Sequence, residues 1–333
     1  MTGTINPSNF LTAQQMTSAD IAPRDYWIYP LLPKHGKGFL IGYPKHGKGH
    51  FIEQLGLCVS EKKPFLGKLP VESARVFYIE LDSVQGDLKD RVDTKQDLLG
   101  FTGSKFFYKA WATETGKQIY LDQTATKDYD GIDTLDTLLT EYEESQIPIN
   151  ILIFDPFMKG ISTGDEQKAF SAIARNIDML LSKHIVSIIF VAHEPKYEYG
   201  DISQRILGTI KYSASADFIW ELKARKEKEE IQGGTLKYTG KIPSGQFDLE
   251  YDRGIWRLSD QQVASLKTKT DKAIKLILDN LSTDKEESEI KKLALRQEIS
   301  ASTFQNALKI LLSEGKVKSI AIDRNKRKLT KGL

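Results

Sequence analysis

The chain has 333 residues, of which 40% are hydrophobic and 28% are charged, as is ordinary for a globular protein with one large and one small domain. Its net charge of +2 is too small to indicate a strongly charged partner. Its single cysteine, Cys58, excludes an internal disulfide and a cysteine-based zinc site. The sequence has no apolar run long enough to cross a membrane and no signal-peptide pattern, which predicts a cytoplasmic protein.

Residues 1–25 are polar and lack a clear period, so we expect an N-terminal arm there. After the arm, short apolar runs alternate with helical patterns, and most of the runs are nearly continuous, as in parallel strands buried on both faces. The expected strands are 38–41, 76–80, 106–109, 149–154, 185–192 and 218–222, and the expected helices are 51–59, 132–143 and 166–183. This alternation predicts an α/β fold built on a doubly wound parallel sheet.

The segment 42–50 follows the first of these strands and leads into the first helix, which is the position of a phosphate-binding loop. Its glycines allow backbone N–H groups to close around phosphate oxygens, while the helix N-terminus and Lys48 supply positive charge. The predicted nucleotide-binding residues are Gly42, Pro44, Lys45, His46, Gly47, Lys48, Gly49 and His50. The alternative is a glycine-rich turn without function.

Position 49 departs from the usual pattern of such a loop. The residue after the lysine is normally Ser or Thr, whose hydroxyl group binds Mg²⁺, but here it is Gly49. The sequence therefore predicts ATP binding more firmly than ATP hydrolysis, with a weakened Mg²⁺ site.

Asp155 follows the apolar run Ile151–Phe154 at the predicted end of a strand. A carboxylate in this position typically meets the metal ion of a bound nucleotide, and ligands of open α/β sheets collect at this edge. We therefore predict that Asp155 is the metal-binding residue. The alternative is that it caps the turn before Pro156.

Two other strand ends carry polar side chains that could act on a nucleotide. Glu80 and Asp82 end the strand from Val76, and either carboxylate could polarise the attacking water. His193 ends the strand 185–192 and could donate a hydrogen bond to the terminal phosphate. The alternatives are a solvated strand end with a helix cap at Asp82 or Ser83, and a histidine that merely satisfies its own hydrogen bonds.

The pattern changes after residue 222. Residues 223–230 form a mixed-charge run, which we expect to be a solvated loop or a helix end. Three short antiparallel strands are expected next, at 235–238, 247–251 and 255–258, with turn residues between them. They predict a hairpin extension at the edge of the sheet, followed by a linker at 260–269.

The C-terminal part has the order of a winged helix, with three helices followed by a hairpin. The expected helices are 271–281, 287–295 and one that opens at 299–302, and the expected hairpin strands are 316–322 and 327–330. The side chains expected to face inward are Ile274, Ile277, Leu278, Phe304, Leu308, Leu311 and Leu312. From residue 316 onward there are seven basic residues and one acid, which indicates either a nucleic-acid contact or a solvated tail.

In this order, the segments 26–33, 64–67, 76–91, 153–157, 193–196 and 207–220 resemble the RecA-like AAA family ATPases of the replicative-helicase and plasmid RepA type. The resemblance implies a RecA-like P-loop domain over 26–262, subunits that assemble in a ring or filament with ATP at their interface, Mg²⁺, and a role in DNA replication or mobile-element maintenance. It also implies a possible replication protein as a partner and no membrane association. It matches Asp82 to the catalytic glutamate, and it makes Arg205 and Lys211 candidates to reach the γ-phosphate of a neighbouring subunit.

The segment 270–333 resembles a winged helix-turn-helix domain. In that family the third helix enters the major groove and the wing contacts the DNA backbone, although some members bind proteins instead. The resemblance implies DNA contacts from Ser302, Thr303, Gln305, Asn306, Arg324, Lys326, Arg327 and Lys328. Our leading hypothesis is thus a DNA-associated, oligomeric ATP-binding protein with weak or absent hydrolysis. The alternatives are a non-hydrolysing adaptor or regulator that acts through its winged helix, and a structural body that binds neither ligand.

Overall fold

The protein is described here by a computed structural model, in which residues 24–162, 166–194, 215–281, 286–297, 299, 301–313, 316–323 and 326–331 are placed. The chain divides into two compact units, one formed by Asp25–Gln262 and the other containing Val263–Leu333. Apart from Arg24 and Asp25, the predicted N-terminal arm lies outside the described residues. Among the described residues, no helix has both the length and the apolarity needed to cross a membrane.

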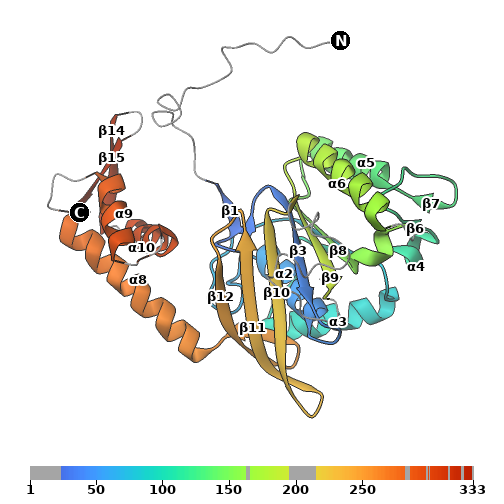
Figure 1. The fold of residues 1–333 in the computed structure, drawn as a ribbon, viewed down its shortest axis with the longest axis horizontal. Helices are drawn as coiled ribbons and strands as arrows, with labels where there is room; N and C mark the ends of the chain where they lie inside the picture. Colours follow the sequence, from blue (N-terminus) through green and yellow to red (C-terminus); the bar gives the residue numbers. More distant parts are fainter. Residues whose placement is uncertain are drawn as a thin grey trace, which may run out of the picture. The chain divides into compact units, whose positions relative to one another are not determined.

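The larger unit is built on a nine-stranded sheet with the order β13-β12-β11-β10-β3-β9-β8-β4-β5 (Figure 1). The strands from β10 to β5 in this order pair in parallel, and β11, β12 and β13 extend the sheet with antiparallel pairs. The parallel strands are β3 (Gly36–Gly42), β4 (Val76–Glu80), β5 (Phe106–Ala110), β8 (Ile151–Asp155), β9 (Ser187–His193) and β10 (Phe218–Glu227). The predicted fold class, an α/β RecA-like P-loop core, is confirmed.

Helices cover both faces of this sheet (Figure 1). On one face, α5 (Ile132–Glu144) and α6 (Glu166–Lys183) pack on alternate strand residues such as Phe39 and Ile41. On the other face lie α2 (Lys48–Ser60) and α3 (Gln85–Leu99). Smaller elements complete the unit: β1 (Tyr26–Ile28), β2 (Leu32–Pro33), α4 (Trp111–Thr115), β6 (Gln118–Ile119), β7 (Tyr129–Asp130) and the 3₁₀ helix η2 (Phe157–Gly160).

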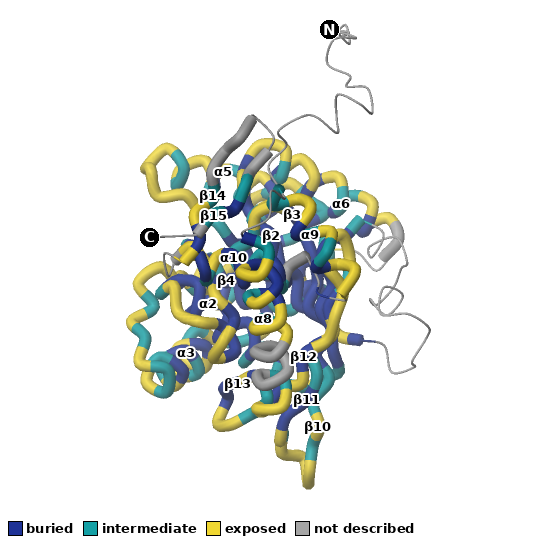
Figure 2. The backbone as a smooth tube through the Cα atoms, turned by 90° about the vertical axis from the view of Figure 1, so that its left-hand side faces the viewer, coloured by how far each residue is buried: buried dark blue, intermediate teal, exposed yellow. Residues whose placement is uncertain are grey.

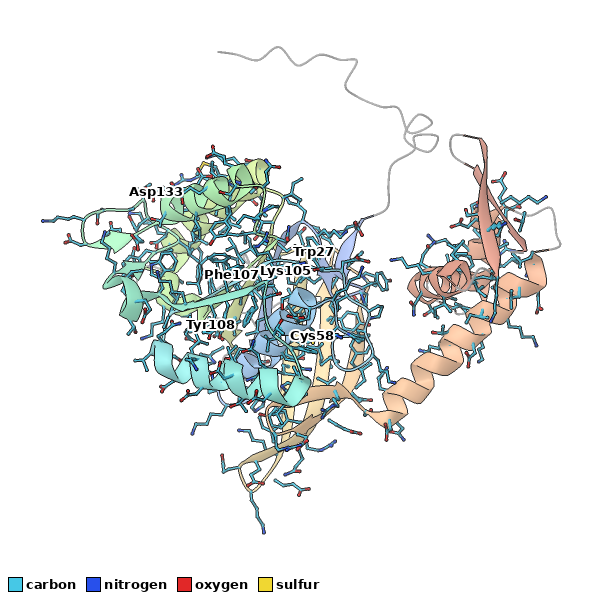
Figure 3. All side chains as sticks on the ribbon, turned by 180° about the vertical axis from the view of Figure 1, so that it is seen from behind. Trp27, Cys58, Lys105, Phe107, Tyr108 and Asp133 are labelled. Carbon is cyan, nitrogen blue, oxygen red and sulfur yellow. The ribbon has the colours of Figure 1, made fainter. Side chains whose placement is uncertain are left out.

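Helix α2 is buried on all sides from Phe51 to Ser60, and Figure 2 shows it among the buried parts of the chain. Its ring contacts include Phe51 with Trp220 of β10. Cys58, labelled in Figure 3, packs inside this core as a small apolar residue, and burial raises the pKa of its thiol to about 12. The predicted phosphate-binding loop therefore leads into a helix that is packed on every side.

The expectation for the mixed-charge run 223–230 is wrong, because β10 continues to Glu227 and β11 (Glu230–Gly240) begins three residues later. The predicted strands that follow are present as β12 (Gly245–Asp252) and β13 (Ile255–Leu258). A hairpin ladder is held by backbone hydrogen bonds, so it can extend past the apolar core with charged side chains. The expected linker is also helical, since α8 runs over Asp260–Asn280.

The smaller unit contains the later part of α8, then α9 (Glu287–Arg296), α10 (Ala301–Ser313) and the hairpin β14 (Val317–Asp323) and β15 (Lys326–Lys331). Its core contains the predicted residues Ile277, Phe304, Leu308 and Leu311, with Ile274 packed against it. The inward predictions for Leu278 and Leu312 are wrong, because both side chains are exposed while Ala273 and Ala307 take the inward positions of their helices. The winged-helix assignment itself stays a prediction.

Candidate nucleotide-binding site

The predicted site residues of the larger unit meet at the carboxyl edge of the parallel sheet. The parallel register places Glu80 at the end of β4 opposite Asp155 at the end of β8, and places Gly42 opposite His193 of β9. Helix α2 begins at the same edge with Lys48. Strands that are distant in sequence therefore bring two carboxylates, an imidazole and an ammonium group together.

The loop between β3 and α2 does not cap the start of the helix with a side chain. Gly47 is the N-cap residue and has a left-handed φ of 77°. Lys45 also has a positive φ, of 61°, and the side chains of Pro44 and Lys45 are both exposed. The first turn of the helix contains no acid. The first backbone N–H groups of a helix have no partner within the helix, so here they can bind phosphate oxygens.

Lys48 places its ammonium group inside this loop. Its Nζ donates to the carbonyl oxygens of Gly42 (2.8 Å) and Tyr43 (2.9 Å) and to Nδ1 of His193 (3.1 Å), which uses all three donors. Burial lowers the pKa of Lys48 to about 8, against the opposing effects of Asp155 and Glu194. The side chain is thus desolvated and held ready for an anionic ligand.

The contact with Lys48 fixes the state of His193. Burial, followed by the nearby Lys48 ammonium, lowers the pKa of His193, so the ring is neutral at physiological pH. Because an ammonium group can only donate, Nδ1 accepts and the ring proton lies on Nε2. His193 can therefore act as a neutral hydrogen-bond donor at this edge.

Tyr78 joins the two strand-end carboxylates. Its hydroxyl lies 2.9 Å from Asp155 Oδ2 and 3.2 Å from Glu80 Oε2. Burial and then the charge of Glu80 raise the pKa of Asp155, whereas the hydrogen bond from Tyr78 opposes that shift. Burial also raises the pKa of Tyr78 well above its ordinary value, so the phenol stays protonated as a donor.

Glu80 and Asp82 occupy different environments. Glu80 is buried, accepts hydrogen bonds from the backbone N–H groups of Asp82 (3.0 Å) and Ser83 (3.3 Å), and forms an ion pair with Arg91 at 3.2 Å. The side chain of Asp82 is 61% exposed and pairs with Lys159 at 3.3 Å. Glu80 is therefore fixed beside Asp155, while Asp82 lies at the rim.

A buried charged network lies behind these groups, and the sequence reasoning missed it. Glu53 of α2 is fully buried and pairs with both Arg91 (2.9 Å) and Lys95 of α3. Lys95 also donates to Nδ1 of His50 at 2.9 Å, so that predicted nucleotide-binding residue is engaged by α3. Burial and then Lys95 lower the pKa of His50 to about 4. The available signal was Glu53, an acidic residue directly after the apolar pair Phe51 and Ile52 of the helix.

The antiparallel extension contacts the loop from the side, which the sequence reasoning also missed. The indole Nε1 of Trp256 in β13 donates to the carbonyl oxygen of Gly47 at 3.3 Å. Gln54 of α2 holds the backbone of Trp256 through two hydrogen bonds of 2.8 Å. The backbone N–H of Ala224 in β10 donates to Nδ1 of His46 at 3.1 Å. These partners are about 180 to 210 residues away in sequence, so no local pattern indicates them.

The space at Gly49 fits the metal side of a nucleotide site. A Cβ atom on Gly49 would lie 3.9 Å from Asp155 Oδ2, an ordinary van der Waals contact. Within the described ranges, no group of three or more His, Cys, Asp or Glu side chains could hold a metal ion by itself. Magnesium would therefore need the phosphates of a nucleotide together with Asp155, a pattern that suits this ion.

The other predicted site residues are in part beyond what the structure describes. Arg205, Lys211 and Arg324 lie outside the described residues. Thr303, Gln305 and Asn306 are half-buried on α10, the helix that also contains Ser302. Lys328 is half-buried on β15, the strand that also contains Lys326 and Arg327.

The fold and the loop define a RecA-like P-loop protein. The AAA domain family AAA_25 matches residues 5–198, more than half of the chain, and the chain therefore belongs to this family. A search of curated proteins gave no match. Among solved structures, the chain is similar to a KaiC-like protein from the hyperthermophilic archaeon Pyrococcus horikoshii, with a TM-score of 0.45 and 13% identity, over 71% of this chain and 99% of that one.

Proposed function

We propose that the protein binds ATP at the loop 42–50 and acts in association with DNA. The observation that carries the ATP proposal is the arrangement of Lys48. Its buried ammonium group lies at the start of an uncapped helix, between the loop carbonyl oxygens and His193. Backbone N–H groups together with a desolvated cation suit a triphosphate.

The first prediction tests this site through Lys48→Ala. Removing a charge-assisted hydrogen bond in a desolvated pocket should weaken ATP binding about 10- to 100-fold. Binding is measured by calorimetry with a non-hydrolysable ATP analogue. Lys68→Ala, at an exposed position of the same unit, is the matched control and should leave the affinity unchanged. Equal affinity in the Lys48 variant and the wild type would rule out the loop as the nucleotide site.

We propose that hydrolysis is slow or absent. Gly49 supplies no hydroxyl group to a metal ion, and the water-orienting role falls to Asp82, a shorter acid than glutamate at the exposed rim. Each fault of position in a catalytic site can cost about 10²-fold in rate. Phosphate binding by backbone N–H groups and Lys48 requires neither group.

The proposed DNA partner is supported by the smaller unit, whose hairpin contains Lys318, Lys326, Arg327, Lys328 and Lys331. Phosphate contacts from such a hairpin would position the unit on DNA without reading its sequence. We further propose a ring or filament of subunits, with Arg205 or Lys211 as candidates for contact with the neighbouring nucleotide. The role in replication or in maintenance of a mobile element, with a replication protein as a partner, belongs to this proposal.

Gly49 also favours the second candidate function, a non-hydrolysing adaptor or regulator. In that case nucleotide binding would alter assembly or DNA affinity without turnover. The two candidates differ in one measurement. A change of oligomeric state or DNA affinity with ATP but no phosphate release favours the regulator, whereas phosphate release stimulated by DNA favours the ATPase.

A further inference from the structure

We propose that the hydroxyl group of Tyr78 gives Asp155 the hydrogen bond that a loop hydroxyl group at position 49 would give, and so fixes Asp155 for the metal ion of the nucleotide site. The inference rests on the proposed ATP binding. Tyr78 would be a positioning residue, because it acts on the metal ion through Asp155.

The first observation is where Tyr78 lies. It is two residues before Glu80 on β4, so both side chains point to the same face of the sheet, and β4 pairs directly with β8. Its hydroxyl donates to Asp155 Oδ2 at 2.9 Å. The ring is 1% exposed and stacks on Phe106 at 16°, so its direction is fixed.

The second observation is where a hydroxyl group at position 49 would lie. A Cβ atom on Gly49 would be 3.9 Å from the same oxygen, Asp155 Oδ2. A serine hydroxyl is one bond further out, so a rotamer directed at Asp155 can bring it within hydrogen-bond distance of that oxygen. Position 49 on α2 and Tyr78 on β4 thus approach the same carboxylate oxygen. Of these two residues, only Tyr78 carries a hydroxyl group.

The third observation is the need for a donor at this place. Asp155 and Glu80 lie side by side at the ends of neighbouring strands, where Glu80 is buried and Asp155 half-buried, and a carboxylate withdrawn from water requires hydrogen bonds. Arg91 and two backbone N–H groups bind Glu80, so Glu80 does not depend on Tyr78. Tyr78 lies 0.3 Å closer to Asp155 (2.9 Å) than to Glu80 (3.2 Å). The phenol therefore donates its hydrogen bond to Asp155 rather than to Glu80.

The test compares the affinity for a fluorescent ATP analogue in Mg²⁺ and in EDTA, using Tyr78→Phe, Gly49→Ser and the double variant. We expect Tyr78→Phe to lower the Mg²⁺-to-EDTA affinity ratio about 10-fold, with little change in EDTA. Because the serine would also bind the metal ion, the double variant is compared with Gly49→Ser alone, and the two should have the same ratio. Tyr108→Phe makes the same chemical change on β5, where Figure 3 labels Tyr108, and should leave the ratio unchanged.

Several outcomes would overturn the proposal. One is an unchanged ratio in Tyr78→Phe, and another is an equal loss in Mg²⁺ and in EDTA, which marks a structural role. A third is a double variant that folds but has a lower ratio than Gly49→Ser alone. If the wild type binds the analogue equally well in Mg²⁺ and EDTA, ATP binding stands and this inference fails. If the wild type binds in neither condition, the proposed function fails as well.

Folding of each variant is checked by thermal unfolding. If Tyr78→Phe does not fold, the comparison moves to the Gly49→Ser background, where the serine should satisfy Asp155. A double variant with the same ratio as Gly49→Ser supports the proposal, and a ratio 10-fold lower overturns it. If the double variant also fails to fold, the phenol has a structural role that serine cannot replace, and the proposal is overturned.

Discussion

The lowered pKa of Lys48 predicts how the affinity for ATP changes with pH. Burial lowers the pKa of Lys48 to about 8, so the free protein loses this charge as the pH rises through about 8. A bound triphosphate favours the charged form and raises that pKa. ATP affinity should then be constant near pH 7 and should fall up to about 10-fold per pH unit above pH 8, with proton uptake. Calorimetry from pH 6.5 to 9.5 checks this, and an affinity that is flat or rises with pH would contradict it.

Gly49 limits turnover in the proposed function, and Gly49→Ser tests that limit. The position has room for a side chain beside Asp155, so the variant should fold normally. A fixed hydroxyl ligand on the metal ion should raise the rate of ATP hydrolysis about 10-fold or more. Phosphate release is the measurement, and Lys48→Ala in the same background is the control that should abolish the gain. Fast Mg²⁺-dependent turnover by the wild type would show that the missing hydroxyl group matters little.

The residues that the sequence identifies and those it misses differ in a physical way. Lys48, Asp155 and His193 stand directly after apolar strands or within a glycine loop, so their position at the sheet edge follows from local pattern. Tyr78 and Trp256 act through partners on other strands and helices, and only the register of the sheet brings them to the site. Their roles cannot be read from neighbouring residues.

At the scale of elements, α2 and α3 are joined by a buried ion network rather than by apolar contact alone. Glu53 pairs with Arg91 and Lys95, and Arg91 also pairs with Glu80 at the end of β4. Removing one partner of a buried ion pair leaves an uncompensated charge, whereas removing both partners together can be nearly neutral. The network therefore couples the loop helix to the strand that contains Glu80.

A double-mutant cycle on Glu53 and Lys95 should show this coupling. Glu53→Gln should lower the free energy of unfolding by about 3 to 5 kcal/mol, and the combination with Lys95→Met should cost less than the sum of the two single changes by at least about 1 kcal/mol. Urea unfolding followed by tryptophan fluorescence measures it, since all four tryptophans lie in the larger unit. Lys89→Met breaks an exposed pair with Asp93 on the same helix and should cost less than about 0.5 kcal/mol. Additive single effects would contradict the coupling.

The limits of helices and strands could be predicted where the pattern of apolar residues determines them. They could not be predicted where that pattern is absent. Strand β4 and helix α6 have the expected limits because β4 is a continuous apolar run and the apolar residues of α6 follow the helical period. Helix α3 was not predicted, since its buried face consists of Leu88, Val92 and the charged Lys95. The first turns of α8 are polar and read as a linker for the same reason.

At the scale of the whole molecule, each of the two compact units has its own apolar core. The buried ion network and the residues of the candidate nucleotide site all lie in Asp25–Gln262, and the basic hairpin lies in the other unit. Nucleotide binding and the proposed DNA binding should therefore be separable properties of one chain.

Truncation of the chain after Gln262 tests this separation. The shortened protein should keep the ATP affinity of the full chain, because the loop and the partners described for it all lie within Asp25–Gln262. Its DNA affinity should be lost. For the full chain, about four phosphate contacts from the hairpin imply an affinity that falls about 100-fold between 50 and 200 mM salt. Filter binding with duplex DNA measures the DNA affinity of the two proteins and its salt dependence. DNA binding that survives the truncation would assign DNA binding to the larger unit.

The bond from Trp256 to the carbonyl oxygen of Gly47 has a consequence for biosynthesis. The loop leaves the ribosome early, but the indole that steadies it is translated 209 residues later. The residues of β3 and α2 are therefore synthesised long before the loop has its final support, and contacts of such long sequence separation form late. We expect the growing polypeptide to become competent for nucleotide only after β13 has emerged, so that premature termination upstream of that strand yields a chain with an unsupported loop.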